Sequence, residues 1–508
     1  MNELKAGAIL NYIAICLNML VGLIYTPFML RMLGQSEYGL YSLASSVIAY
    51  LAVLDLGFGN AIIRYTAKFR AEGKRKEQEE MFGMFFILYI CIGIIALIAG
   101  ALLTFNVENM FSQSMSPEEM NRTKIIMALM TFNLAFTFPM SIWGSIMMAY
   151  ERFVFQKIIS ILRTIMNPVV MIFFLVAGYK AVTMVVVTTI FNIVTLLINW
   201  WYCKNKLSIN VRFAKFKFAF LKEVSIYSFW IFLNAIMDRI YWSTGQFVLG
   251  IYRGTIAVAV YAVAIQFQGF YMMFSTAVSS VFLPKVTAMV TKKSSDKELS
   301  DLFIRTGRIQ YIVMAFILSA FIVFGRPFIQ VWAGEGYSDA YYICLMFIIP
   351  LTVPLIQNLG ITILQARNQM KFRSILYIII ALVSLVLSIA LAKIYGGYGC
   401  AFSTSLALIV GQIIIMNMYY YCRQHIDIIK FWKEISKMSM VPVLSIILGL
   451  YFVNSFLLSD ISLISLMIYG TIFMIIYIIA FWKFSLNSNE KELLAAPFAV
   501  LRNNKLKV

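Results

Sequence analysis

Residues 85–103 read FFILYICIGIIALIAGALL and contain no charged side chain. A helix that crosses the hydrocarbon of a bilayer needs about 20 mostly apolar residues, and this stretch is long enough. Its hydrophobicity is continuous, whereas the strands of a membrane barrel alternate apolar and polar residues over about 10 positions. Because a helix satisfies its backbone hydrogen bonds within one segment, the stretch predicts a transmembrane helix.

Similar stretches recur along the 508 residues, of which 61% are hydrophobic and 13% charged. A soluble protein has about 45–50% apolar and about 25% charged residues. The composition therefore predicts an all-α polytopic membrane protein with about fourteen transmembrane helices. The first span is too long for the apolar part of a cleaved signal peptide, so we expect it to be helix 1 of the mature protein. The expected spans are residues 6–30, 40–63, 82–104, 125–148, 158–178, 181–202, 224–250, 256–283, 305–325, 341–364, 374–392, 398–420, 437–457 and 461–482.

The formal net charge of +19 is distributed unevenly between the two sides of these spans. Of the 42 Lys and Arg residues, 33 lie on the side of the N-terminus and 7 on the opposite side. Since loops rich in Lys and Arg stay in the cytoplasm, both termini are expected to be cytoplasmic. The surplus of basic residues therefore indicates the orientation of the protein in the membrane, and it also attracts anionic lipid heads. We expect no nucleic-acid partner.

Enzyme and metal chemistry find little support in the sequence. The six cysteines are scattered without a CxxC pair, and His425 is the single histidine. We therefore expect no metal site and no cofactor. The longest outer loop, residues 105–124, is too short for a catalytic domain, so we expect a protein that is not an enzyme.

The sequence also contains an internal repeat. At an offset of 216, residues 17–34 match 233–250 at six of 18 positions, including Asn18 with Asn234 and Tyr25 with Tyr241. At an offset of 217, the loop after the fourth span matches the loop after the tenth. Six helices per unit give two lobes in the same orientation, the usual build of a rocking transporter. The expected organisation is an N-lobe at 1–218, a C-lobe at 219–436, and an appended helix pair with a cytoplasmic tail at 437–508.

Residues 27–68, PFMLRMLGQSEYGLYSLASSVIAYLAVLDLGFGNAIIRYTAK, carry a family resemblance. The segments LGxxxYGLY at 33–41 and LDLGFGNA at 54–61, followed by Arg64, resemble the start of polysaccharide-biosynthesis (Wzx-type) flippases. AxERFxF at 149–155 is similar too. The resemblance implies membership of the multidrug/oligosaccharidyl-lipid/polysaccharide exporter superfamily. It also implies movement of an undecaprenyl-pyrophosphate-linked oligosaccharide to the outer leaflet of a bacterial cytoplasmic membrane, with membrane lipids and a polysaccharide polymerase as partners.

Ionisable side chains inside a span are costly and usually face a partner or a watery cavity. Asp55 lies in the second span, Arg163 in the fifth, and Asp238 and Arg239 are neighbours in the seventh. Arg64 ends the second span on the predicted cytoplasmic side.

Polar stripes accompany these charges. Asn18 and Tyr25 share one face of the first helix, the repeat pairs them with Asn234 and Tyr241, and Gln266 lies on the eighth helix. Arginine matches phosphate oxygens with a planar fork, while amides and hydroxyls bind sugar hydroxyls. We therefore expect one substrate site that includes Arg239, Asp238, Asp55, Arg163, Arg64, Asn18, Asn234, Tyr25, Tyr241 and Gln266.

Structural interpretations stay open for the same residues. Asp55 could pair with a neighbouring arginine or cap a broken helix, and Asp238 with Arg239 could belong to a structural ion-pair network. Arg163 could extend to the interface, and the Asn stripes could join neighbouring helices.

Functional alternatives stay open too. They are a cation-coupled multidrug antiporter, a lipid II flippase, a membrane sugar polymerase or glycosyltransferase, and a purely structural scaffold. The sequence does not say whether H⁺ or Na⁺ is coupled to transport.

Overall fold

The computed structural model describes residues 3–214, 218–279, 282–292, 294–457 and 462–492, and every regular element in these ranges is helical. The expected all-α membrane fold is thereby confirmed. The chain divides into two compact units, which are described separately. The first unit comprises Met1–Ala262 with Leu385–Cys400, and the second comprises Val263–Ser384 with Ala401–Val508.

Most helices of the first unit are long enough to cross a bilayer. Its elements are α1 (Glu3–Leu51), η1 (Ala52–Asp55), α2 (Phe58–Ala71), α3 (Arg75–Phe105), α4 (Val107–Phe111), α5 (Pro117–Ala149), α6 (Phe153–Val176), α7 (Ala181–Asn205) and most of α8 (Phe218–Ser279).

The second unit continues from α8. Its elements are α9 (Leu283–Thr291), α10 (Asp296–Ala333), η3 (Glu335–Tyr337), α11 (Asp339–Ile356), α12 (Leu359–Ala366), α13 (Lys371–Ala407), η4 (Leu408–Ile415), α14 (Met416–Cys422), α15 (Ile428–Phe452), η5 (Val453–Leu457) and α16 (Leu463–Phe484). Residues 385–400 of α13 belong to the first unit.

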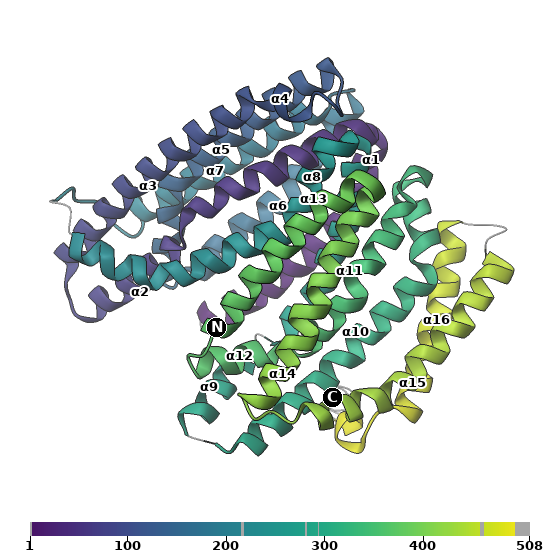
Figure 1. Cartoon of the computed structure of the whole chain (residues 1–508). Coiled ribbons are helices and arrows are strands. Elements are labelled where there is room, and N and C mark those ends of the chain that lie inside the picture. Colours follow the sequence, from purple (N-terminus) through teal and green to yellow (C-terminus); the bar gives the residue numbers. More distant parts are fainter. Residues whose placement is uncertain (1–2, 215–217, 280–281, 293, 458–461, 493–508) are drawn as a thin grey trace, which may run out of the picture. The chain divides into compact units, whose positions relative to one another are not determined.

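Three of the longest helices are interrupted by a glycine. Gly34 breaks α1 and Gly254 breaks α8, each with φ of 77°, and Gly396 breaks α13 with φ of 56°. Side chains disfavour positive φ, so glycine suits these breaks. In Figure 1 the purple α1 runs from the N-terminus to its label and then returns.

Eleven helices in the described residues are long and apolar enough to cross a membrane. Three of them, at Leu10–Ala71, Phe232–Thr276 and Lys371–Gln424, contain the glycine breaks and run to 62, 45 and 54 residues. A helix rises about 1.5 Å per residue and the hydrocarbon is about 30 Å thick, so each is too long for one crossing. The expected count of fourteen crossings stays a prediction.

Two expected spans are not single helices. Residues 40–63 were expected to form one helix, but left-handed backbone at Leu56 (φ 53°) and Gly57 (φ 71°) separates η1 from α2. Residues 341–364 likewise divide into α11 and α12, because regular helix stops at Ile356 and resumes at Leu359.

The expected outer loop 105–124 is largely helical. It contains α4 and the first turns of α5. The reason lies in the start of α5. Ser116 accepts a hydrogen bond from the Glu119 amide, the Glu119 carboxylate accepts one from the Ser116 amide, and Pro117 occupies the first turn. This reciprocal cap favours an early start of the helix.

Some expectations fall outside the described residues. They concern the end of the eighth span at residues 280–281, position 461 at the start of the last span, part of the basic segment at 215–217, and the basic tail at 493–508.

Local geometry repeats at an offset of 217 residues. Glu151 and Asn368 both have left-handed backbone, with φ of 59° and 57°. The stacked rings of Phe155 and Tyr202 have centroids 4.0 Å apart, and the corresponding Phe372 and Tyr419 rings are 4.1 Å apart. These matches support an internal repeat between residues 146–209 and 363–426.

The offset of 216 does not hold at the helix breaks. It pairs Gly34 with Gly250, whereas the break in α8 lies at Gly254. The two break positions therefore differ by four residues, which is close to one helical turn. A shift of one turn leaves the polar side chains on the same face, so the polar pattern in the sequence could not reveal the shift.

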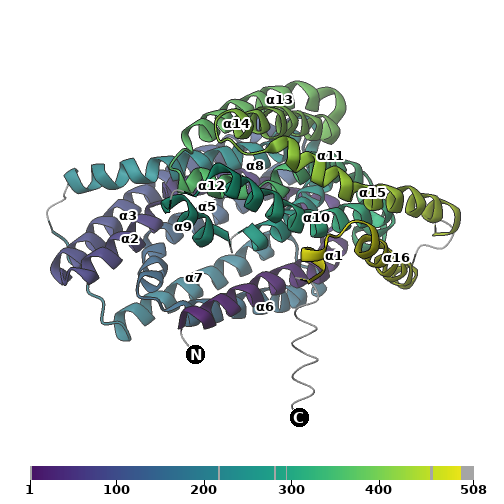
Figure 2. The same ribbon diagram turned by 90° about the horizontal axis from the view of Figure 1, so that it is seen from below.

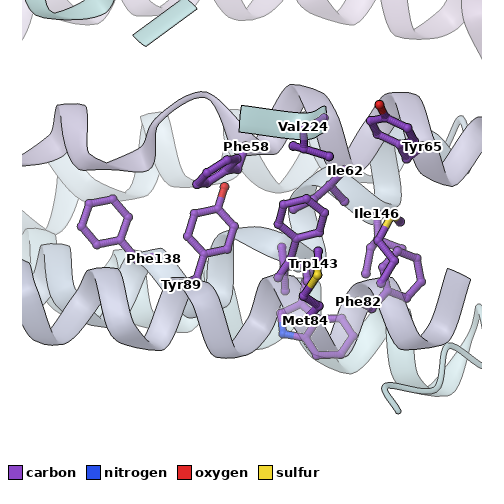
Figure 3. Packing of buried hydrophobic residues seen from close by; sticks show 14 of the residues in the cluster. Phe58, Ile62, Tyr65, Phe82, Met84, Tyr89, Phe138, Trp143, Ile146 and Val224 are labelled. Carbon is purple, nitrogen blue, oxygen red and sulfur yellow. The ribbon is translucent and has the colours of Figure 1, made fainter. Parts of the chain in front are cut away.

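The core of the first unit is aromatic. Phe58 and Tyr65 of α2 pack against Phe82 and Tyr89 of α3 and against Trp143 of α5, as Figure 3 shows. Figure 1 shows α3, α5 and α7 running alongside one another within this unit. A side chain at position 100 of α3 would collide with Thr131 of α5. Small residues at such positions let membrane helices approach closely.

In the second unit, α10 packs against α11, α15 and α16. Near one end, the buried Arg308 of α10 donates two hydrogen bonds to Glu490, at 2.6 and 2.9 Å, and one to Glu434 of α15, at 2.8 Å. This ion-pair cluster ties the segment after α16 to the helices of the unit.

Candidate functional site

A polar cavity lies among α1, α5, α6 and α7 of the first unit. Its volume is about 330 Å³. Figure 2 shows α6 and α7 beside α1, and the helix contacts agree. Apolar atoms make up the larger part of the lining surface, but polar side chains from all four helices also line the cavity. They are Tyr41, Ser45, Asn133, Thr137, Arg163, Thr188, Thr189 and Asn192.

Arg163 supplies the charge of this cavity, which we call the Arg163 cavity. One guanidinium nitrogen of the half-buried Arg163 donates to Oδ1 of Asn192 at 2.9 Å. The amide nitrogen of Asn192 donates in turn to Asn133 Oδ1 and Thr137 Oγ1, both at 2.8 Å. No carboxylate of the described residues pairs with Arg163. The cavity therefore carries a net positive charge held by neutral amides.

Two polar atoms near Arg163 have no partner among the described residues. Thr189, which lines the cavity and is 7% exposed, has a buried hydroxyl without a hydrogen bond. Oδ1 of Asn167, four residues beyond Arg163 on the same face of α6, is also buried without one. Buried polar groups are usually hydrogen-bonded, so the Thr189 hydroxyl and the spare guanidinium donors suit a polar anionic ligand, whereas Oδ1 of Asn167 requires a donor.

Asp55 lies at a different place in the first unit. It ends η1 at the left-handed break, and its carboxylate accepts a hydrogen bond of 2.9 Å from the hydroxyl of Tyr89 on α3. Arg64 follows on α2, where its side chain is exposed and its guanidinium carbon lies 5.8 Å from the Tyr65 ring centroid.

The polar stripe on α1 approaches α6. Asn18 is exposed, and its Oδ1 lies 3.5 Å from the hydroxyl of Thr164, the neighbour of Arg163. The hydroxyl of Tyr25 is buried and has no hydrogen-bond partner among the described residues.

The predicted site residues of α8 differ in exposure. Asp238 and Arg239 are exposed, Asn234 is half-buried, and Tyr241 is buried with its ring centroid 5.2 Å from that of Trp242. Gln266 is half-buried and belongs to the second unit. Of the ten predicted site residues, only Arg163 lines the Arg163 cavity within the described part of the chain.

The sequence analysis missed the amide and hydroxyl partners of Arg163. Asn133 and Thr137 are four residues apart on α5, and Thr188 and Asn192 are four apart on α7. Each pair therefore shares one face of an apolar helix. That spacing is the signal that could have identified them.

A comparison with protein families shows which family the chain belongs to. Residues 4–290, more than half of the chain, match the family model described as polysaccharide biosynthesis protein. The chain belongs to this family. The resemblance of residues 27–68 and 149–155 is therefore confirmed.

Two curated proteins are similar to this family member over most of its length. An uncharacterized membrane protein, EpsK, of Bacillus subtilis (strain 168) is 20% identical over 413 residues, which cover 80% of this chain and 81% of EpsK. A putative O-antigen transporter of Shigella flexneri is 18% identical over 400 residues, covering 77% and 92% of the two chains.

A solved structure shares the fold. The lipid II flippase MurJ, in an inward closed conformation, superimposes with a TM-score of 0.71 over 97% of this chain and 99% of MurJ. The sequences are only 16% identical, so this likeness concerns the fold alone. This polysaccharide-biosynthesis family member is thus a multi-pass membrane protein with the fold of that flippase.

Proposed function

We propose that this protein flips an undecaprenyl-pyrophosphate-linked oligosaccharide from the inner to the outer leaflet of a bacterial cytoplasmic membrane, for surface polysaccharide export. The family, and the likeness to a protein named as a putative O-antigen transporter, support this substrate class.

The observation that carries the proposal is the unpaired charge in the Arg163 cavity. A buried charge without a counter-charge is costly, and such residues in membrane proteins usually serve a ligand or an ion path. Arginine keeps its charge at any relevant pH and fits phosphate oxygens with two parallel donors. A pyrophosphate supplies the missing negative charge, and the surrounding Asn and Thr side chains suit sugar hydroxyls.

The proposed mechanism is alternating access. An N-lobe at residues 1–218 and a C-lobe at 219–436 rock against each other, with 437–508 appended and both termini in the cytoplasm. The head group crosses inside the protein while the lipid tail stays in the bilayer. An anionic head that leaves a negative interior gains about 2.3 kcal/mol per charge for each 100 mV of membrane potential.

The rival within this fold is a cation-coupled multidrug antiporter. Asp55 is the observation in its favour, because a carboxylate at a helix break could bind H⁺ or Na⁺. In the Arg163 cavity, however, the charged group is a cation, which repels the cationic drugs and coupling ions of such an antiporter. The lipid II flippase alternative differs in the head group that is moved.

The test is carried out in a strain that lacks the gene. We expect the deletion strain to accumulate an unflipped lipid-linked oligosaccharide and to lose surface polysaccharide. Plasmid-borne Arg163→Gln is expected to leave both defects uncorrected, whereas Arg163→Lys corrects them in part. Lys157→Gln is the matched control, because Lys157 lies on the same helix α6 but bonds Asn11 at 2.8 Å outside the cavity.

Equal membrane levels of all variants, measured by immunoblot, are required. Full export by Arg163→Gln would remove the Arg163 cavity from the pathway. Accumulation of an ordinary drug, with normal lipid-linked sugars, would favour the antiporter. Accumulation of lipid II would favour the other flippase.

A further inference from the structure

A second cavity opens at the end of the first unit that is predicted to face the cytoplasm. Its volume is about 370 Å³. It lies where α2 ends, α3 begins, and the segment 207–210 passes beside the turn that follows α5. We call it the Arg70 cavity. The polar side chains that matter for its chemistry are Arg70, Arg75, Gln78, Glu79 and Tyr150.

Arg70 is exposed, and its guanidinium is anchored by two contacts that do not neutralise its charge. Its guanidinium donates to the carbonyl of Ala149 at 2.9 Å and lies 4.1 Å from the ring centroid of Tyr150. The Tyr150 hydroxyl accepts a hydrogen bond from Gln78 at 2.8 Å, which fixes the ring. No carboxylate of the described residues pairs with Arg70. A stacked arginine of this kind presents its remaining donors in a defined plane.

The nearby carboxylates are occupied by other cations. Glu79, 7% exposed in its side chain, accepts from Arg75 at 3.3 Å and pairs with Arg212 at 2.7 Å. Glu72 pairs with Lys74 at 2.7 Å, and the hydrogen bond from Lys74 lowers the pKa of the Glu72 carboxyl. Arg75 and Arg212 therefore share one buried carboxylate while Arg70 has none, and the cavity keeps a positive surplus.

The start of α3 adds to this surplus. Lys74, at the N-cap of α3, gives no side-chain cap to the first amides of the helix. The N-terminal end of a helix carries a partial positive charge and favours anions. The helix end alone is not a site, but here it borders a cavity that two arginines line.

The internal repeat offers a comparison within the same chain. At the offset of 217, Tyr150 corresponds to Arg367 in the second unit. Arg367 donates to Asp296 at 2.6 Å and to the side-chain oxygen of Gln424 at 3.1 Å. In the second unit, the position that corresponds to Tyr150 thus holds an arginine paired with an aspartate.

We propose that the Arg70 cavity binds a phosphate group, carried either by an anionic phospholipid of the inner leaflet or by a free phosphate compound. The guanidinium groups of Arg70 and Arg75, which are both exposed, supply charged donors, and Tyr150 forms an aromatic wall. The site is separate from the Arg163 cavity and does not rest on the flipping function. The proposed site also gives a role to the motif at residues 149–155, because the carbonyl of its first residue, Ala149, accepts a hydrogen bond from Arg70.

The experiment uses the full-length protein and two probes. In one arm the protein is reconstituted in nanodiscs containing phosphatidylglycerol and phosphatidylcholine, and the lipids retained after release are counted by native mass spectrometry. In the other arm, inorganic pyrophosphate is titrated against the protein in phosphatidylcholine nanodiscs, and binding is followed by calorimetry. Each arm compares the wild type, Arg70→Gln/Arg75→Gln, and the control Lys76→Gln, which removes an exposed charge beside the cavity but not in its lining.

Losing charged hydrogen bonds should weaken binding about tenfold or more in the double variant, while Lys76→Gln stays within about twofold of the wild type. An effect in the first arm identifies a phospholipid, and an effect in the second arm identifies a free phosphate compound. Equal binding by the double variant and the control, or binding of neither probe to the wild type, would overturn the proposal. Unchanged melting of the double variant excludes misfolding, and Arg70→Lys/Arg75→Lys should recover part of the affinity.

Discussion

Asn192→Asp tests the charge of the Arg163 cavity without changing its shape. The substitution replaces one amide nitrogen by oxygen, so a carboxylate would lie at the position where Oδ1 of Asn192 now accepts from Arg163 at 2.9 Å. Arg163 would gain an internal counter-charge. We predict that the variant folds normally and no longer flips the anionic head group, because the cavity has become neutral.

The magnitude follows from the bonds involved. A hydrogen bond to a charged group contributes about 1.5–3 kcal/mol, so a pyrophosphate that loses one such bond binds about 10- to 150-fold more weakly. The fold should tolerate the change. Thr137 can donate to the new carboxylate, and Asn133 can turn its own amide toward it, since both already lie 2.8 Å from the amide nitrogen of Asn192.

The assay is flipping in proteoliposomes that contain the lipid-linked oligosaccharide extracted from the deletion strain. Access of an external glycosidase to the sugar reports the leaflet. Asn192→Leu is the contrasting variant, because it leaves Arg163 charged but removes its hydrogen-bond partner, and it should lower thermal stability. Normal flipping by Asn192→Asp, at an unchanged melting temperature, would refute the reasoning.

Two further predictions concern stability, measured in detergent by the reactivity of buried cysteines with a thiol dye on heating. Arg308→Met leaves the buried carboxylate of Glu490 without its partner and removes one of the two cations that pair with the half-buried Glu434, which costs about 3–5 kcal/mol and should lower the Tm by about 6 °C or more. Glu490→Gln keeps an acceptor for Arg308 and should cost less than half as much; equal losses would show that a neutral acceptor is insufficient and that the ion pair depends on the charge of Glu490. Tyr89→Phe removes a hydrogen bond to Asp55 and should cost about 1–3 kcal/mol, whereas no change in Tm would show that the contact is not stabilising.

The length and continuity of the hydrophobic segments were sufficient to predict an all-helical membrane protein. A continuous apolar segment such as residues 85–103 can satisfy its backbone hydrogen bonds in lipid only as a helix, so the fold class follows from local composition. The breaks at Gly34 and Gly254 were harder to locate, because a helix can turn at one glycine without any polar loop to mark the position.

The candidate site was predictable only in part. Arg163 stood out because a charge in an apolar helix is rare. Asn192 and Thr137 could not be identified in the same way, because their role depends on which faces of α5 and α7 contact α6. A single sequence does not show which helix faces are in contact. The charge balance of the Arg70 cavity was equally hidden, because Glu79 and Arg212 are far apart in the sequence and meet only in the folded unit.

A structure of the protein with its lipid-linked oligosaccharide bound tests the central claim most directly. The account predicts the pyrophosphate within hydrogen-bond distance of the Arg163 guanidinium, with a sugar hydroxyl near the unpartnered Thr189 hydroxyl. A pyrophosphate bound elsewhere, with Arg163 still joined only to Asn192, would contradict it.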